Sequence, residues 1–211
     1  MSKRIICSSR RHALATSFLV ILLSMLVGAV LWRKLPPQMA VHFNFAGEPD
    51  GYAPKAFAVF GLPLFFLGAQ LLCAHVSLHL PENPRLLPAV ILRVVPILSI
   101  FVSWMLYAHA LGGRPDVRLW TQLAIGMILL LLGNAVPKGA AVLQLGNRNL
   151  PLAAKQKLAR FSGYCLVTGG AAVCAGSFFG ISQLFFAVVI LVTVLPPAYS
   201  VFLRRSMPPQ M

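Results

Sequence analysis

The polar side chains most able to do chemistry gather between Leu35 and Lys55, in the segment LPPQMAVHFNFAGEPDGYAPK. His42, Glu48 and Asp50 place one imidazole and two carboxylates within nine residues, and such groups can transfer protons or ligate a metal. One histidine with two acids in a turn rich in Pro and Gly is, however, a weak version of a metal-binding pattern. We therefore expect no metal at this segment.

Carboxylates are scarce in the rest of the chain. Only four acids occur among the 211 residues, and the remaining two, Glu82 and Asp116, lie outside the apolar runs. Acid–base and nucleophilic catalysis need sets of groups that no spacing in this chain assembles. We expect neither an enzyme nor a bound cofactor. Proton-coupled transport is disfavoured because it relies on acids or histidines inside the membrane, whereas an uncoupled channel stays open as an alternative.

The same segment predicts a strand followed by a tight turn. Apolar residues stand at every second position, at Met39, Val41, Phe43 and Phe45. This two-residue period is typical of a half-buried strand. In the following GEPDG, residues 47–51, we expect Gly51 to adopt a positive φ in the reversal. The aromatic side chains of Phe43, Phe45 and Tyr52 should pack on the helices, since they would otherwise stay exposed.

The composition predicts an integral membrane protein. Hydrophobic residues make up 58% of the chain and charged residues 10%, whereas soluble proteins average about half and about a quarter. Six apolar runs approach or exceed the length of a membrane-spanning helix, about 20 residues. They lie at about residues 13–32, 56–76, 88–110, 119–136, 162–180 and 183–203. We expect an all-α bundle of six transmembrane helices in one domain, residues 1–211, with a structured outer loop at 33–55 between the first two helices.

The basic residues predict the orientation in the membrane. If the N-terminus is cytoplasmic, twelve of the 18 Lys and Arg residues fall in inner segments and five in outer ones. Cytoplasmic loops carry such an excess, so we expect both termini inside and the loop at 33–55 outside. The net charge of +14 is divided among loops beside apolar runs, so no direct nucleic-acid binding is expected.

Two polar side chains lie inside apolar runs, Gln70 in the second and Arg93 in the third. Intramembrane polar groups are functional candidates. Arg93 stands five positions past the start of its run, about 7 Å of helix rise, so we expect its side chain to reach back to the cytoplasmic interface. The loop at 138–160 is basic and has no acid; it predicts a short helix from Pro151 on the anionic lipid surface, or a docking site for a soluble partner.

Two motifs carry a resemblance to a known family. The segment at 35–55 resembles the opening signature of the bacterial SdpI-type membrane proteins, and GNAVPK at 133–138 is similar to the family's G-N-x-x-P-K element. The likeness weakens at 146–148, where this chain has GNR and the family has G-I-R. SdpI-type proteins are six-span bundles that protect cells against an exported peptide toxin. In the best-known case they pass the toxin signal to a soluble repressor held at the membrane.

The resemblance implies two groups of site residues. Those of the outer loop, expected to recognise the toxin, are His42, Asn44, Gly47, Pro49, Asp50, Gly51, Tyr52 and Lys55. Those of the inner motif, expected to relay the signal, are Gly133, Asn134, Pro137, Lys138, Gly146 and Arg148. The implied partners are the lipid bilayer, an extracytoplasmic peptide toxin and a cytoplasmic regulator, and the implied location is the bacterial cytoplasmic membrane.

A second hypothesis makes the protein a small membrane transporter, channel or lipid-interacting protein. It would be built around the kinked second and third runs, with Pro63, Gln70, Arg93 and Pro96. Solute flux in sealed vesicles separates the two hypotheses, as does the presence of a toxin-type or repressor gene beside this one.

The cation bias gives a test of orientation. In a variant without the native cysteines, single cysteines at Gln38 and at Gln156 should react with a membrane-impermeant thiol reagent from opposite sides of the membrane. Intact cells should label only the first, and inverted vesicles only the second. Labelling of both from one side would contradict the predicted topology.

Overall fold

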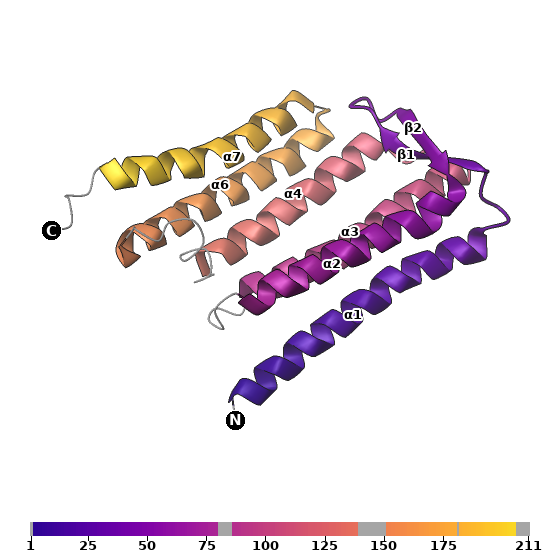
Figure 1. Cartoon of the computed structure of the whole chain (residues 1–211). Helices are drawn as coiled ribbons and strands as arrows, with labels where there is room; N and C mark the ends of the chain where they lie inside the picture. The colour runs from indigo at the N-terminus through magenta and orange to yellow at the C-terminus, as the bar shows by residue number, and fades with distance from the viewer. Residues whose placement is uncertain (1, 80–85, 139–150, 181, 206–211) are drawn as a thin grey trace. The chain divides into compact units, whose positions relative to one another are not determined.

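The computed structural model describes residues 2–79, 86–138, 151–180 and 182–205. It is predominantly helical, with one small antiparallel sheet (Figure 1). The elements in chain order are α1 (Ser2–Leu31), β1 (Gln38–Phe43), β2 (Pro49–Pro54), η1 (Phe57–Gly61), α2 (Leu62–His79), α3 (Leu86–Ala110), α4 (Val117–Ala135), η2 (Val136–Lys138), α6 (Leu152–Phe178) and α7 (Ser182–Arg205).

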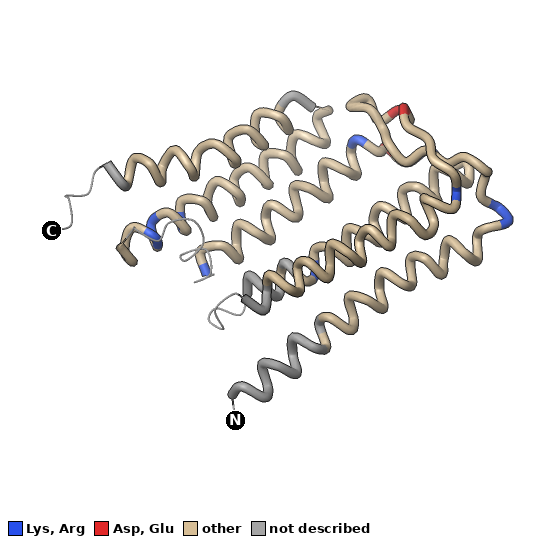
Figure 2. The backbone as a smooth tube through the Cα atoms, in the orientation of Figure 1, with Lys and Arg blue, Asp and Glu red and all other residues tan. Residues whose placement is uncertain are grey.

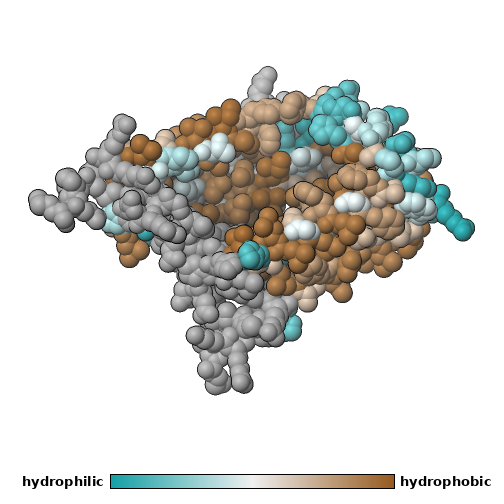
Figure 3. Space-filling model, in the orientation of Figure 1, coloured by the Kyte–Doolittle hydropathy of each residue, from teal (hydrophilic) through white to brown (hydrophobic). Residues whose placement is uncertain are grey.

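Among the described residues, six helical segments are long and apolar enough to cross a membrane. These segments are Leu14–Leu31, Phe57–Val76, Leu92–Ala110, Val117–Lys138, Leu152–Phe178 and Leu184–Leu203. Many of their large apolar side chains face outward, as in Leu19, Phe65 and Ile190, and Figure 3 shows hydrophobic residues covering the helices. Such surfaces are stable only in an apolar solvent. The all-α, six-helix membrane class predicted from the sequence is confirmed.

The described chain divides into two compact units. Unit 1 contains residues 1–79 and 91–120, and unit 2 contains residues 80–90 and 121–211. The prediction of one undivided transmembrane domain stays a prediction. Most helix ends agree with the expected ranges to within a few residues, but α1 begins eleven residues before the expected first span and α6 begins ten residues before the expected fifth span. The separate interfacial helix expected from Pro151 is wrong, because Pro151 caps α6 and the good helix formers that follow continue it without a break.

In unit 2, α6 and α7 run side by side in opposite directions (Figure 1). Glycines on α6 allow the close approach. A Cβ at Gly169 would lie 2.8 Å from a methyl carbon of Val188, and one at Gly176 would lie 2.7 Å from a methyl carbon of Leu184. Small residues at helix contacts bring backbones together and increase van der Waals packing, which is the main attraction between helices in lipid.

The core of unit 1 joins the strands to three helices. Its buried residues come from the link between α1 and β1, from β1, from η1 and from the end of α3: Leu35, Met39, Ala58, Val59, Leu106 and Tyr107. Gly28 of α1 meets this core, because a Cβ there would lie 2.8 Å from both the Tyr107 ring and a Val59 methyl group. The Tyr107 hydroxyl donates a hydrogen bond of 3.2 Å to the Ser24 carbonyl of α1. The two-stranded sheet therefore rests on a packed platform.

A second junction of unit 1 forms around one backbone carbonyl, that of Leu92 in α3. Its usual partner in the helix would be the N–H four residues on, but that residue is Pro96, which has none. Two side chains from other helices donate to it instead. The Ser17 hydroxyl of α1 lies 3.0 Å from the carbonyl oxygen, and Nε2 of Gln70 in α2 lies 3.1 Å from it. Ser17 and Gln70 are both buried, so this carbonyl connects three helices away from solvent.

This junction predicts an energetic coupling between Gln70 and Pro96. Gln70→Met removes the donor at similar volume and should destabilise the wild-type protein by about 0.5 to 1.5 kcal/mol. In a Pro96→Ala background the helix supplies its own N–H to the carbonyl, so the same change should cost less. A double-mutant cycle measured by unfolding in mixed micelles, followed by circular dichroism, gives the coupling energy.

A cycle of Gln70→Met with Pro196→Ala is the matched control. Pro196 lies in α7 of unit 2, and two changes that share no partner should add within about 0.5 kcal/mol. Additive effects of Gln70→Met and Pro96→Ala would show that the freed carbonyl does not join these helices.

Candidate functional site

The segment singled out by its polar residues forms a β-hairpin at the end of unit 1 where α1 ends and η1 begins (Figure 1). β1 and β2 pair antiparallel, with Met39 opposite Ala53, Ala40 opposite Tyr52 and His42 opposite Gly51. The register is irregular between Ala40 and His42 and again between His42 and Phe43. Such irregularities bend a strand and redirect its side chains.

The reversal lies earlier than the sequence predicted. Oδ1 of Asn44 accepts hydrogen bonds from the backbone N–H groups of Ala46 and Glu48, at 2.9 and 3.0 Å, so the turn is built around this side chain. Gly47 is the residue with positive φ, at 85°. The expected positive φ at Gly51 is wrong, because Gly51 lies in β2 and the chain has already turned.

The hairpin packs on the helices through β1. Met39 and Ala40 are buried, and the Phe43 ring meets His109 of α3 edge to face at a centroid distance of 5.3 Å. The expected packing of all three aromatics is therefore correct only for Phe43. Phe45 is 76% exposed and Tyr52 is 63% exposed, because Phe45 follows Asn44 into the turn and the two-residue period ends there.

A pair of polar side chains bridges the outward side of the hairpin. Nδ1 of His42 lies 2.5 Å from a carboxylate oxygen of Asp50, and the two side chains are 72% and 44% exposed. We refer to His42, Phe45, Asp50 and Tyr52 together as the exposed group. It combines an imidazole, a carboxylate and two aromatic rings on a backbone held by buried residues.

Lys55 fastens the hairpin to the turn that follows α1. Its Nζ donates a hydrogen bond of 3.1 Å to the Trp32 carbonyl and lies 4.6 Å from the centroid of the Trp32 ring. A cation over an indole face is attracted by the electrons of the ring. Lys55 and Asn44 thus have positioning roles, and Pro49 pairs with Phe43 at the start of β2. Whether any of them also contacts a ligand stays a prediction.

The inner motif has two kinds of member. Gly133 and Pro137 pack on α6: a Cβ at Gly133 would lie 2.9 Å from the Gly163 carbonyl oxygen, and a Cβ at Gly163 would collide with the Pro137 ring. Asn134 and Lys138 are exposed, and Nζ of Lys138 donates to Oδ1 of Asn134 at 2.6 Å. The other two predicted members, Gly146 and Arg148, lie outside the described residues.

The two intramembrane candidates have different surroundings. Gln70 is fully buried at the Leu92 carbonyl, and within the described residues its Oε1 accepts no hydrogen bond. Arg93 is exposed on α3, and its reach to the cytoplasmic interface stays a prediction. Sequence reasoning missed Ser17 and Tyr107, although the position of Pro96 four residues after Leu92 is a signal that a donor is needed there.

The chemistry that these groups can perform is limited in the part of the chain that the structure describes. No three His, Cys, Asp or Glu side chains there come together in a way that could hold a metal ion. The His42–Asp50 pair is a two-member arrangement in open solvent, which suits hydrogen bonding and ionic contact with a ligand.

Comparison with known proteins gives one match. Residues 19–67 match a family model described as "Domain of unknown function (DUF1648)". The matched range runs from α1 through the hairpin and η1 into α2, so it contains the exposed group and most of its platform. No curated protein and no solved structure matches the chain. The fold and this match together describe a multi-pass membrane protein with a DUF1648 region at its hairpin.

Gly51 tests whether the hairpin is rigid. A Cβ at this position would lie 2.8 Å from the His42 Cβ. Cβ atoms in real proteins essentially never approach a non-bonded atom this closely. Gly51→Val should therefore separate the strands at a cost of about 1 to 3 kcal/mol. Cleavage of a fast-opening segment follows the population of its open form, so proteinase K should cut the hairpin at least about fivefold faster than in the wild type.

Tyr52→Val is the matched control for this change. It introduces the same residue at the next position of β2, where the side chain is exposed and a β-branched residue suits a strand. It should keep the protease resistance of the wild type. Equal cleavage of wild type and Gly51→Val would mean that the hairpin is not held in the described form.

Proposed function

We propose that the protein protects a bacterial cell against an exported peptide toxin, as SdpI-type proteins do, and that the exposed group of the hairpin binds the peptide. The observation that carries the proposal is the exposed His42–Asp50 pair on a hairpin whose β1 strand is buried at Met39 and Ala40. A ligand that meets a fixed surface does not have to order it, so less binding energy is lost.

The composition of the exposed group supports a peptide as the ligand. The Phe45 and Tyr52 rings offer large apolar contacts at low conformational cost, and the His42–Asp50 pair offers a donor and an acceptor for backbone or side-chain groups. Aromatic anchors beside a few polar groups are typical of binding surfaces. A peptide that carries both apolar and polar side chains matches this surface.

The proposal includes an orientation and a relay. In the bacterial cytoplasmic membrane with both termini inside, the hairpin faces outward, where an exported toxin arrives. The relay would use the exposed Asn134–Lys138 pair, which joins the last turn of α4 to η2, with Arg148, to contact a cytoplasmic regulator. The role is that of a binding protein without catalysis or cofactor.

A transporter or channel is the second candidate, favoured by one observation. The side-chain oxygen Oε1 of Gln70 is buried in the interior of unit 1, and no donor among the described residues bonds it. Unpaired polar atoms at such depth cost free energy and are typical of sites that act on a solute. Solute flux through sealed vesicles that is lost in Gln70→Met would favour this candidate over the first.

The experiment for toxin protection starts from a gene deletion. Cells without the protein should become sensitive to a peptide encoded beside the gene or secreted by the same cells, and the wild-type gene should restore resistance. Unchanged sensitivity across the available peptides would contradict the proposed role.

Variants then test the exposed group. His42→Ala and Asp50→Asn each weaken a charge-assisted contact, so we expect the inhibitory peptide concentration to fall about tenfold at unchanged membrane levels. Gln38→Ala, an exposed change at the start of β1, is the control and should protect fully. Asn134→Ala should leave peptide binding intact and reduce only the response of a regulator. Full protection by His42→Ala and Asp50→Asn would contradict the assignment of the site while leaving the role itself standing.

A further inference from the structure

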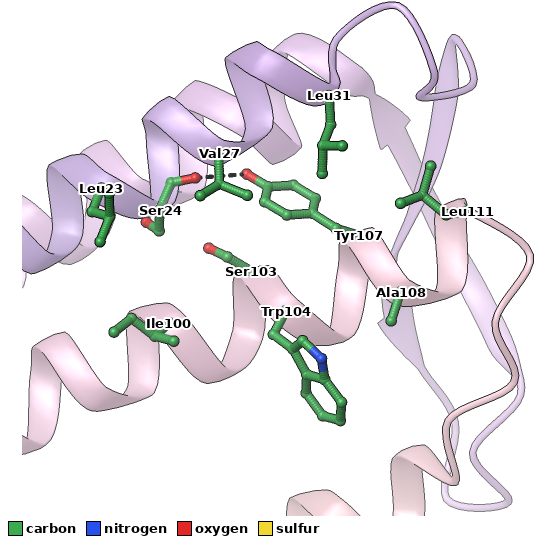
Figure 4. Close-up of a pocket in the computed structure, with 10 residues that line it drawn as sticks. All are labelled: Leu23, Ser24, Val27, Leu31, Ile100, Ser103, Trp104, Tyr107, Ala108 and Leu111. Carbon is green, nitrogen blue, oxygen red and sulfur yellow. Dashed lines mark hydrogen bonds between the residues drawn. The ribbon is translucent and has the colours of Figure 1, made fainter.

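An apolar groove of about 390 Å³ lies between α1 and α3 of unit 1 (Figure 4). Leu23, Val27 and Leu31 line it from α1, Ile100 and Trp104 line it from α3, and Leu111 lines it just past the end of α3. The groove is part of neither the hairpin surface nor the junction at the Leu92 carbonyl. Its volume is in the range of pockets that hold small ligands.

The length of the groove matches one leaflet of a bilayer. Its lining runs from Ile100 in α3 to Leu111 just past the helix end, which corresponds to about 16 Å at the rise of a helix. Half of the hydrocarbon core of a bilayer measures about 15 Å. Both α1 and α3 are spanning helices, so the groove runs along the membrane normal from near mid-depth to the hairpin end of the unit.

The groove presents mainly apolar side chains to any molecule that occupies it. Two of the polar residues among them already have partners inside the protein: the Ser24 hydroxyl donates to the Ile21 carbonyl at 2.7 Å, and the Tyr107 hydroxyl donates to the Ser24 carbonyl. Figure 4 shows the Tyr107 hydroxyl directed at α1. A polar solute would lose hydrogen bonds to water here without replacement, whereas an alkyl chain would lose none.

The mouth of the groove is basic. Arg33 and Lys34 follow the last lining residue of α1, and Arg114 follows that of α3; Figure 2 shows basic residues at this end of unit 1. All three are exposed, and their side chains have no ion pair within the described segments. Two nearby acids are engaged elsewhere: Asp50 pairs with His42, and Asp116 accepts from the Leu119 N–H at 2.9 Å.

We infer that the groove binds one acyl chain of an anionic phospholipid, with the phosphate group among Arg33, Lys34 and Arg114. The alkyl chain matches the length and apolar lining of the groove, and the phosphate matches the unpaired cations at its mouth. A zwitterionic phospholipid satisfies the first condition and gains less from the second. The inference concerns the lipid on the hairpin side and stands whether or not the hairpin binds a toxin.

Trp104 provides a reporter, because it lines the groove. A variant with Trp32→Phe and Trp120→Phe retains it as the single tryptophan, and bromine atoms on a lipid chain quench tryptophan on contact. The protein is reconstituted in phosphatidylcholine vesicles that contain either dibromo-phosphatidylglycerol or dibromo-phosphatidylcholine at increasing mole fraction. We expect the anionic lipid to show at least about fivefold higher relative affinity, the effect of one cation at an anionic headgroup.

Charge and shape variants separate the two parts of the site. Neutralising the mouth with Arg33→Gln, Lys34→Gln and Arg114→Gln should bring the relative affinity to about 1. Lys155→Gln with Lys157→Gln, which removes two cations from α6 instead, should leave it unchanged. Ala108→Phe places a ring in the groove and should reduce quenching by both brominated lipids.

Equal quenching by the two lipids in the otherwise unchanged reporter would overturn the inference. A preference for the anionic lipid that survives neutralisation of the mouth would overturn it too. Quenching by neither lipid would mean that protein closes the groove, and it would overturn the inference as well. Native mass spectrometry of the wild-type protein, with all three tryptophans in place, is an independent measurement. It should show phosphatidylglycerol retained in preference to phosphatidylcholine, and this preference should be lost in the neutralised variant.

Discussion

The carbonyl that Pro96 leaves without a helical donor is the constraint on which unit 1 depends. In the hydrocarbon of a bilayer no water can take the place of the missing N–H, so another part of the protein must supply a donor. Ser17 and Gln70 do so from two different helices. Because both donors must reach the same atom, their bonds set the positions of α1 and α2 against α3. The ends of these helices then meet where the hairpin core forms, with Met39 and Tyr107 buried between them.

The helices could be predicted from the sequence because the solvent imposes their length and polarity. A run of about 20 apolar residues has few alternatives in a membrane, and the six expected runs correspond to six helices. The hairpin was predictable only in part. Alternation from Met39 onward indicated a strand, but side-chain hydrogen bonds decide where a strand ends. Asn44 binds two backbone N–H groups and begins the turn before Phe45, so the aromatic ring expected in the core lies outside it.

The interior contacts could not be read from local pattern, because their partners are distant in the chain. Ser17 and Leu92 are 75 residues apart, and Ser24 and Tyr107 are 83 apart. A single sequence contains no measure of such pairings, and a serine in an apolar run has the same appearance whether it bonds its own helix or another. Pro96 alone gives a local indication, since a proline inside a helix always releases a carbonyl four residues before it. The hairpin residues were singled out by a resemblance and lie within the matched DUF1648 range, but their division into positioning and exposed members depends on burial.

Tyr107 connects the two surfaces that are proposed to bind a ligand. It belongs to the buried core that also contains Met39 of the hairpin, and it lines the groove together with Trp104. Gly28 holds the backbone of α1 so close that the ring has no free space to move toward that helix. An alkyl chain that fills the groove would therefore press on the same side chain that supports the hairpin. If lipid in the groove favours one position of Tyr107, it also favours the hairpin arrangement that goes with that position. Lipid would then change the affinity of the hairpin for its ligand by some factor, and by reciprocity a ligand on the hairpin would change the affinity of the groove for lipid by the same factor.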